Sequence, residues 1–144
     1  MKKNQMEVMR EARRRALDQG VMFHTINLKN ETGKKGAGNI IVAYKKVQEG
    51  YFPRKSTGYI ALQLGYMNRA YIVQCSFCSP NEKNPSRTFG EGQAALRFFN
   101  ASSALVLRLE DSQSLTNGLR SLVLYEAIQR NVLWLRDKTL EDLV

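Results

Sequence analysis

The sequence predicts an α+β fold: a mostly antiparallel sheet of four or five strands, packed by an N-terminal, a middle and a long C-terminal helix. Three observations lead to this class. Strand-like alternation recurs within residues 21–77, helix-forming composition occupies residues 5–19 and 91–103, and a helical apolar period occupies residues 115–138. The 144 residues, 43% of them hydrophobic, are enough for a core of their own. We therefore expect a single domain over residues 1–144.

The first elements follow from local composition. Residues 5–19 are good helix formers and are followed by Gly20, a common helix stop. Residues 21–30 alternate apolar and polar side chains, which is the strand period. Three glycines and two lysines predict a flexible basic loop at 31–38, and residues 39–48 then form the next strand.

The central segment is interpreted as a loop and a hairpin. Pro53 and two glycines interrupt residues 49–58, which predicts a second flexible basic loop. Residues 59–77 alternate β-branched and aromatic residues with others on either side of positions 66–69. Two strands paired as a hairpin are the simplest interpretation of this pattern.

The second half of the chain is more helical. Two prolines exclude regular structure from residues 78–92, and residues 91–103 then have helical composition. Residues 104–110 predict a short apolar strand. Residues 115–138 carry an apolar face wide enough to form the core and to be shared with a second subunit.

The charge distribution points to a polyanionic partner. The net charge is +9, and residues 1–89 hold 16 Lys/Arg against 6 Asp/Glu, whereas residues 90–144 hold 6 against 7. Nucleic acid, an anionic membrane and an acidic protein surface all fit such a surplus. The apolar runs are too short for a membrane span or a secretory signal, and the N-terminal helix lacks aromatic membrane anchors. We expect a cytoplasmic protein that binds no membrane, in the host cytoplasm if a phage encodes it.

Aromatic and basic residues are interleaved in the centre of the chain. Eight of the twelve Tyr and Phe residues lie from Tyr44 to Phe89, together with seven Lys/Arg. Single-stranded nucleic acid needs this mixture, because bases stack on rings for roughly 1–3 kcal/mol each while cations follow the phosphates. The alternative is that the tyrosines are half-buried strand residues. The predicted nucleic-acid-binding residues are Lys34, Lys35, Tyr44, Lys45, Lys46, Tyr51, Phe52, Arg54, Lys55, Tyr59, Tyr66, Arg69 and Arg87.

Arg87 belongs to a second candidate anion site. Ser86, Arg87 and Thr88 stand beside Gly90 and Gly92, at the expected start of a helix. Such a segment either places amides, a hydroxyl and a guanidinium around a phosphate, or is a capped helix entry. Both interpretations stay open from the sequence.

Two charged segments near the chain ends have two interpretations each. Arg10, Arg13 and Arg14 share one face of the first helix, either as a cationic ridge that binds phosphate or acidic residues of a neighbouring subunit, or as a solvated face. The acidic and apolar tip at 137–144 loosely resembles the partner-recruiting tips of single-stranded-DNA-binding proteins. It is otherwise a simple helix end.

Catalytic chemistry is not predicted. His24 is the only histidine, so no Ser/His/Asp or Cys/His arrangement can be argued. Cys75 and Cys78 form a single CxxC without a second pair, which predicts two reduced thiols or a redox pair rather than a zinc site. We expect no enzyme activity, no cofactor and no metal.

The small size, the basic tyrosine-rich centre, the segment "QCSFCSPNEKNPSR" and the lack of catalytic residues together resemble small bacteriophage single-stranded-DNA-binding cofactors of RNA polymerase. The resemblance implies promoter melting or strand capture beside a phage-encoded RNA polymerase, a homo-oligomer, and a fold other than the standard OB barrel. The expected function is non-catalytic binding of single-stranded DNA with low sequence specificity, in transcription or replication. The alternative is a phage interaction protein that docks on RNA polymerase or sequesters a nucleotide.

Overall fold

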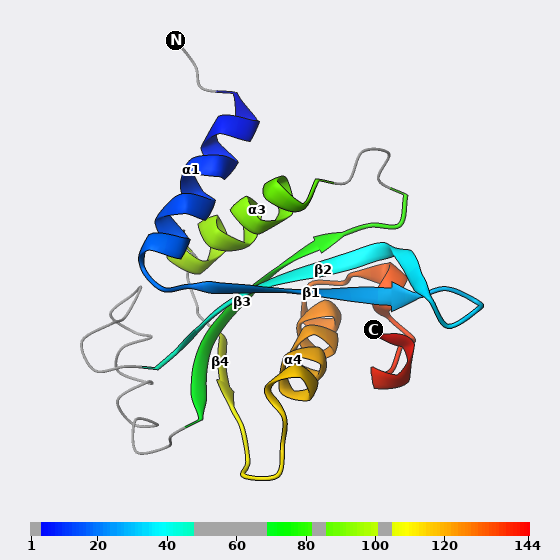
Figure 1. The fold of residues 1–144 in the computed structure, drawn as a ribbon. Coiled ribbons are helices and arrows are strands. Elements are labelled where there is room, and N and C mark those ends of the chain that lie inside the picture. Colours follow the sequence, from blue (N-terminus) through cyan, green and yellow to red (C-terminus); the bar gives the residue numbers. More distant parts are fainter. Residues whose placement is uncertain (1–3, 48–68, 82–85, 101–104) are drawn as a thin grey trace.

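The computed structural model describes residues 4–47, 69–81, 86–100 and 105–144, with no side-chain detail for residues 35–37 (Figure 1). Four antiparallel strands form an open sheet in the order β1-β2-β3-β4. This confirms an α+β fold that is not a closed barrel. The strands are β1 (Met22–Lys29), β2 (Lys35–Lys46), β3 (Ala70–Cys78) and β4 (Leu105–Arg108). The helices are α1 (Gln5–Asp18), α3 (Arg87–Asn100) and α4 (Leu115–Gln129), followed by the short 3-10 helices η1 (Leu133–Leu135) and η2 (Leu140–Asp142).

Helices cover both faces of the sheet. In Figure 1, α1 and α3 lie together on one face, and α4 with the C-terminal segment lies on the other. Because successive strand residues point to opposite faces, the run from residue 40 to 43 supplies both cores at once. Ile41 and Ala43 pack toward α1 and α3, whereas Ile40 and Val42 pack toward α4. This two-sided burial explains why β2 has an apolar run rather than strict alternation.

The layer of α1 and α3 depends on small residues. Ala12 and Ala16 of α1 and Ala94 and Ala95 of α3 are buried in this core. Gly92 permits the closest approach, since a Cβ there would lie 2.5 Å from the carbonyl oxygen of Met9. The two helices therefore pack with their backbones nearly in contact.

The C-terminal residues close part of the β1 edge. Leu28 and Leu143 form an isolated antiparallel bridge. The amide of Asn27 donates to the Val144 carbonyl at 2.7 Å, and the Val144 amide donates back at 2.8 Å. Leu143 is buried in the α4-side core. The acidic and apolar tip is thus neither a plain helix end nor a detached tail, because its last residues extend the sheet.

The β1–β2 connection is shorter than the sequence predicts. β2 begins at Lys35, so the predicted loop at 31–38 is wrong for its second half. The turn is closed by Asn30, whose side-chain oxygen accepts from the Lys34 amide, and by Gly33 at φ +78°. Gly38 is a strand residue that leaves room for Trp134, since a Cβ there would lie 2.7 Å from the indole ring.

The predicted hairpin within residues 59–77 is also wrong in its pairing. Ala70–Val73 is hydrogen-bonded to β4 on one side, and the overlapping residues from 71 onward pair with β2 on the other. No side of this part of β3 is left for the preceding segment. The first predicted arm, residues 59–65, and the loop at 49–58 lie outside the described residues.

Two helix boundaries differ from the prediction. α3 begins at Arg87, about four residues earlier than predicted, because Ser86 caps it by accepting from the Phe89 amide at 3.2 Å. α4 ends at Gln129 rather than continuing to residue 138. Asn131 has φ 54°, a left-handed conformation that ends an α-helix.

Candidate nucleic-acid interface

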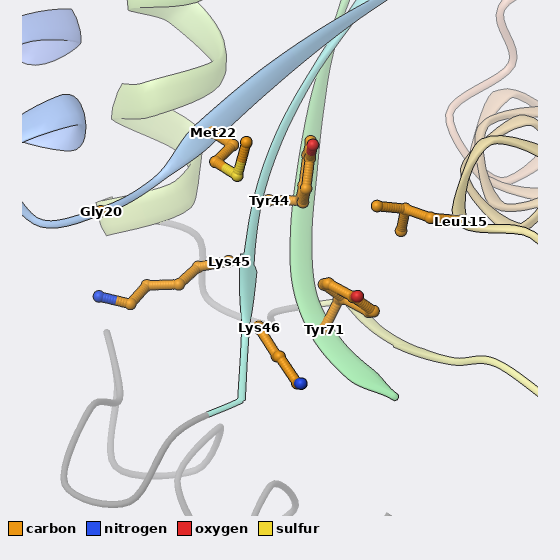
Figure 2. Close-up of a pocket in the computed structure, with 7 residues that line it drawn as sticks. All are labelled: Gly20, Met22, Tyr44, Lys45, Lys46, Tyr71 and Leu115. Carbon is orange, nitrogen blue, oxygen red and sulfur yellow. The ribbon is translucent and has the colours of Figure 1, made fainter. Parts of the chain in front are cut away.

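A pocket of about 400 Å³ opens where β2 ends and β3 begins (Figure 2). Its aromatic wall consists of Tyr44 and Tyr71, whose ring centroids are 6.1 Å apart at an interplanar angle of 66°. The two rings come from neighbouring strands and point to the α4 face, where Leu115, the first residue of α4, lies opposite them. Met22 and Gly20, Lys45 and Lys46 complete the lining. We call this site the tyrosine pocket.

Both tyrosines are half-buried and pack against the core, so they are strand residues and pocket walls at once. Burial raises the pKa of Tyr44, and Tyr71 raises it further. The phenol therefore stays protonated well above neutral pH. A neutral ring beside apolar Met22 and Leu115 offers a flat, uncharged surface that suits a nucleobase.

The two lysines at the end of β2 have different surroundings. Lys46 is exposed and lies on the same face as the tyrosines. Lys45 points to the other face, where its ammonium donates to the Gln19 carbonyl just beyond α1. A cation at a helix C-terminus interacts favourably with the helix dipole. Lys46 is therefore the better candidate for a phosphate contact at the pocket.

Arg69 positions the pocket from outside. Its guanidinium donates to the carbonyls of Glu110, Asp111 and Gln113, at 2.6, 3.1 and 2.5 Å. These carbonyls belong to the connection between β4 and α4, which leads to Leu115 in the pocket wall. The structure thus gives Arg69 a structural role that the sequence did not indicate.

The remaining described candidates lie away from the tyrosine pocket. Lys34 is exposed in the β1–β2 turn and Lys35 opens β2, so they lie at the opposite end of this strand from Lys46. Eleven residues of strand span about 36 Å, which separates the two lysine pairs into different regions. Arg87 begins α3, on the other side of the sheet, and its Nε donates to Glu91 at 3.0 Å. The other predicted contacts, Tyr51, Phe52, Arg54, Lys55, Tyr59 and Tyr66, lie outside the described residues.

The segment around Arg87 is a capped helix entry. Gly90 and Gly92 lie inside α3 rather than in a loop, and they serve packing. A Cβ on Gly90 would lie 2.5 Å from Ile41, just as one on Gly92 would meet Met9. The capped helix entry is therefore confirmed, whereas a phosphate bound by Ser86, Arg87 and Thr88 at this N-terminus stays a prediction.

The arginine ridge of α1 is partly used within the fold. Arg13 donates to the buried Glu91 at 3.2 Å. The neighbouring Arg15 lies over the Phe99 ring, 4.0 Å from its centroid. Arg10 and Arg14 are exposed. Only part of this ridge is thus a solvated face.

Sequence reasoning missed four residues at or near the tyrosine pocket. Met22 and Leu115 line it, and neither carries a chemical signal in the sequence. His24 lies two residues beyond Met22 on the same strand, and burial followed by the charge of Arg120 lowers its pKa. In the described part of the chain, His24 Nε2 and Arg120 Nε are both buried without a hydrogen-bond partner. Buried polar atoms of this kind are rare, and each calls for an explanation.

The known proteins give no independent guide. Comparisons with protein-family models, with curated proteins and with solved structures find no match. Within the described ranges, no helix has the length and apolar character needed to cross a membrane, and no three His, Cys, Asp or Glu side chains gather as a metal site. Any function must therefore be argued from the pocket and its charges.

Proposed function

We propose that the chain binds single-stranded DNA with low sequence specificity and without catalysis, holding one base in the tyrosine pocket and phosphates on nearby lysines. The observation that carries this proposal is the tyrosine pocket itself. Two uncharged rings, Met22 and Leu115 form apolar walls, and the exposed Lys46 lies beside them. Its volume of about 400 Å³ falls in the range of small-ligand pockets.

The expected preference for single-stranded over duplex DNA follows from the geometry of stacking. A base in a duplex has both faces covered by its neighbours, so it cannot enter a pocket without being flipped out, which costs a few kcal/mol. A single strand offers its bases freely, and every base has a π-face, so stacking discriminates little between sequences. The positive surplus of residues 1–89 supports a polyanionic ligand of this kind.

The proposal includes a homo-oligomer formed through the exposed side of α4. Tyr125 and Ile128, three residues apart on α4, are 58 and 62% exposed, and Leu133 in the following η1 is 72% exposed. Neighbouring large apolar side chains with this exposure indicate an interaction surface. They lie in the part of the chain with almost balanced charge, where two copies of a +9 protein can meet with the least repulsion. Light scattering of Ile128→Glu against wild type tests this interface. An unchanged mass, or a monomeric wild type, contradicts it.

From the resemblance to phage cofactors we also propose a role in phage transcription or replication, with RNA polymerase as a second partner. Affinity capture from nuclease-treated lysate tests this partner. Polymerase retained without nucleic acid supports a direct contact. Polymerase that is lost on nuclease treatment, or never captured, argues against one.

Fluorescence anisotropy with labelled oligonucleotides tests the central proposal. We expect a single strand to bind more tightly than the same sequence as a duplex, and log affinity to fall linearly with log salt. Tyr71→Leu keeps apolar volume but removes the ring, and should weaken binding by roughly fivefold to a hundredfold. Tyr71→Phe keeps the ring and should bind like wild type. Equal affinity for duplex and single strand contradicts the stacking part of the proposal.

Two lysine variants form a matched pair for the electrostatic part. Lys46→Gln should weaken binding and reduce the salt slope by about 0.7 if one phosphate contact is lost. Lys34→Gln makes the same charge change at the far end of β2, so it should leave the binding of a short oligonucleotide nearly unchanged. A larger effect of Lys34→Gln would place the interface elsewhere.

Nucleotide sequestration is the second candidate function, favoured by a pocket that accommodates a single base. The same assay distinguishes it through ligand length. A strand binder gains affinity as the oligonucleotide grows, because more phosphates are neutralised. A nucleotide-sequestering protein binds a mononucleotide as tightly as an oligonucleotide.

A further inference from the structure

His24 and Arg120 place two unpartnered nitrogen atoms between β1 and α4. His24 Nε2 and Arg120 Nε are buried and have no hydrogen-bond partner among the residues that the structure describes. Arg120 makes no hydrogen bond or ion pair within the described residues, although its side chain is half-buried. A guanidinium stays charged at any physiological pH, so burial of its Nε–H without an acceptor costs free energy. An anion that accepts from Arg120 would remove that cost.

The acidic residues of the buried cores already have other partners. Glu126 accepts from Arg130 at 2.6 Å, on the flank of α4 that faces β3. Glu91 accepts from Arg13 and Arg87 on the opposite face of the sheet. Neither carboxylate is bound to Arg120. Within the described residues no side chain accepts from Arg120, which leaves room for an acceptor supplied by a ligand or by water.

The pair lies next to the tyrosine pocket. From Met22 in the pocket to His24 is two residues along one face of β1, about 7 Å. From Leu115 in the pocket to Arg120 is five residues along α4, about 7.5 Å. Arg120 lies within electrostatic range of His24, because its charge contributes to the lowered pKa of that imidazole. The cation and the imidazole thus lie about one nucleotide unit beyond the pocket, under α4.

We propose that Arg120 and His24 bind a phosphate monoester joined to the nucleoside whose base occupies the tyrosine pocket. This inference rests on the proposed function and specifies which part of a DNA strand the site binds. Arg120 supplies charge-assisted N–H donors, and the His24 ring supplies a further N–H when the ring nitrogen that faces the phosphate carries the proton. No bond is made or broken.

A terminal phosphate monoester fits this position better than an internal phosphodiester. Within the described residues the unpartnered nitrogens are buried, on a strand and on a helix, so a phosphate that reaches them has to leave bulk solvent. An internal phosphodiester continues as a chain on both sides. A monoester continues on one side only and carries up to two negative charges near neutral pH. Strand ends and free mononucleotides share this chemistry.

Oligonucleotides of one sequence with different ends test the inference. We expect the 5′- or the 3′-phosphorylated strand to bind about tenfold more tightly than the unphosphorylated one, as a charge-assisted hydrogen bond allows. The circular form should bind like the unphosphorylated strand. Equal affinities for all four forms, or a circle that binds as tightly as a phosphorylated strand, would overturn the inference while leaving strand binding intact. A mononucleotide that binds as tightly as the phosphorylated strand identifies the free nucleotide as the source.

Variants separate the subsite from the general charge of the protein. Arg120→Gln should abolish the preference for the phosphorylated end while the unphosphorylated strand still binds. Arg14→Gln removes one positive charge from the exposed side of α1 and should keep the preference. Should Arg120→Gln fail to fold, Arg120→Lys, which keeps the charge but loses the fork of donors, is expected to reduce the preference. A preference that survives in the folded Arg120 variant refutes the assignment.

The single histidine gives a readout that is independent of oligonucleotides. Inorganic phosphate titrated into the wild-type protein should move the His24 imidazole signals in NMR spectra and raise the His24 pKa, because a bound anion favours the charged ring. The Arg120→Gln or Arg120→Lys variant should not show this response. If phosphate moves these signals but no oligonucleotide binds, strand binding is wrong and the subsite stands. If oligonucleotides bind and phosphate leaves His24 unchanged, the subsite is wrong.

Discussion

Arg97 and Arg130 donate to the same acceptor, the carbonyl oxygen of Cys75, at 2.9 and 3.2 Å. Arg97 belongs to α3 and Arg130 follows α4, so the two guanidiniums arrive from opposite faces of the sheet. They meet on β3 beyond Val73, where pairing with β4 ends. No described strand pairs with this edge of β3 beyond Val73, and two long cations placed across such an edge oppose its pairing with other chains.

Cys75 should be the slower of the two thiols to react. Burial raises the pKa of Cys75 to about 12, whereas Cys78 is only half-buried. Because the thiolate is the nucleophile, we expect an aromatic disulfide reagent to label one thiol, Cys78, in the native protein. Mass spectrometry of the labelled peptides identifies the site, and labelling in denaturant provides the control for both thiols. Rapid native labelling of Cys75 would contradict its burial.

The same thiol should make stability decline in alkaline solution. From its ordinary pKa of 9.0 to the native value of about 12, the unfolded chain releases a proton that the native chain retains. The native state then binds more protons, so the free energy of unfolding falls as pH rises, by up to about 1.4 kcal/mol per unit. Urea titrations at several alkaline pH values measure this slope. Cys75→Ala should be less stable throughout but should lack this component of the slope.

Glu91 should stabilise the contact between α1 and α3. Its side chain is 5% exposed and accepts from Arg13 and Arg87, whose side chains are 40 and 76% exposed. Glu91→Gln keeps the shape but removes the charge that both guanidiniums approach. We expect a loss of about 1–3 kcal/mol in the free energy of unfolding, measured by chemical denaturation. The exposed Glu31→Gln should change stability by less than about 0.5 kcal/mol. Equal stability of the two variants would mean that the solvated arginines contribute nothing through Glu91.

Two glycines of α3 provide a test of packing at the same helix surface. In Gly92→Ala the new Cβ would lie 2.5 Å from a backbone oxygen of Met9, which cannot move without shifting α1. In Gly90→Ala it would lie 2.5 Å from the terminal Cδ1 of Ile41, a side chain that can change rotamer. We expect Gly92→Ala to lose about 1–3 kcal/mol and Gly90→Ala to lose less, partly offset by the better helix propensity of alanine. Thermal denaturation ranks the two, and the reverse order would contradict the α1–α3 contact.

Arg69 should contribute to the stability of the fold, and only through the fold to DNA binding. Arg69→Gln loses donors to three carbonyls that hold the connection between β4 and α4. We expect a loss of about 1–3 kcal/mol in the free energy of unfolding. DNA should also bind less tightly at the tyrosine pocket, because Leu115 in its wall follows this connection. Lys46→Gln, which also removes one positive charge, should keep wild-type stability. If Arg69→Gln is fully stable yet binds DNA weakly, Arg69 contacts phosphate rather than the loop.

The sequence predicts the layers better than the connections. The pattern of residues 40 to 43 indicates a strand, and the structure shows why it is apolar on both faces. The sequence does not predict where α3 begins or where α4 ends. The serine cap of α3 and the left-handed Asn131 after α4 are effects of single residues on the backbone. The hairpin was misassigned because alternation identifies a strand without identifying its neighbour.

At the tyrosine pocket, too, the sequence predicts which face of a strand a residue occupies but not which distant residues it contacts. Alternation places Tyr44 and Lys46 on one face and Lys45 on the other, which follows from the strand period alone. That Lys45 meets the end of α1, and that Arg69 meets a loop 41 to 44 residues away, depends on tertiary contacts. Met22, Leu115 and Arg120 are candidates only because α4 packs against the face of the sheet to which Tyr44 and Tyr71 point. Residue type and spacing contain no such information.

The length of β2 sets a scale for any polyanion that follows it. Lys34 and Lys35 lie at one end of this strand and Lys46 at the other, about 36 Å apart by strand geometry. A stacked nucleotide strand advances about 3.4 Å per residue, so roughly ten nucleotides are needed to reach from one lysine pair to the other. A shorter oligomer bound at the tyrosine pocket does not reach the turn. Lys34→Gln should therefore weaken the binding only of oligomers longer than roughly ten nucleotides.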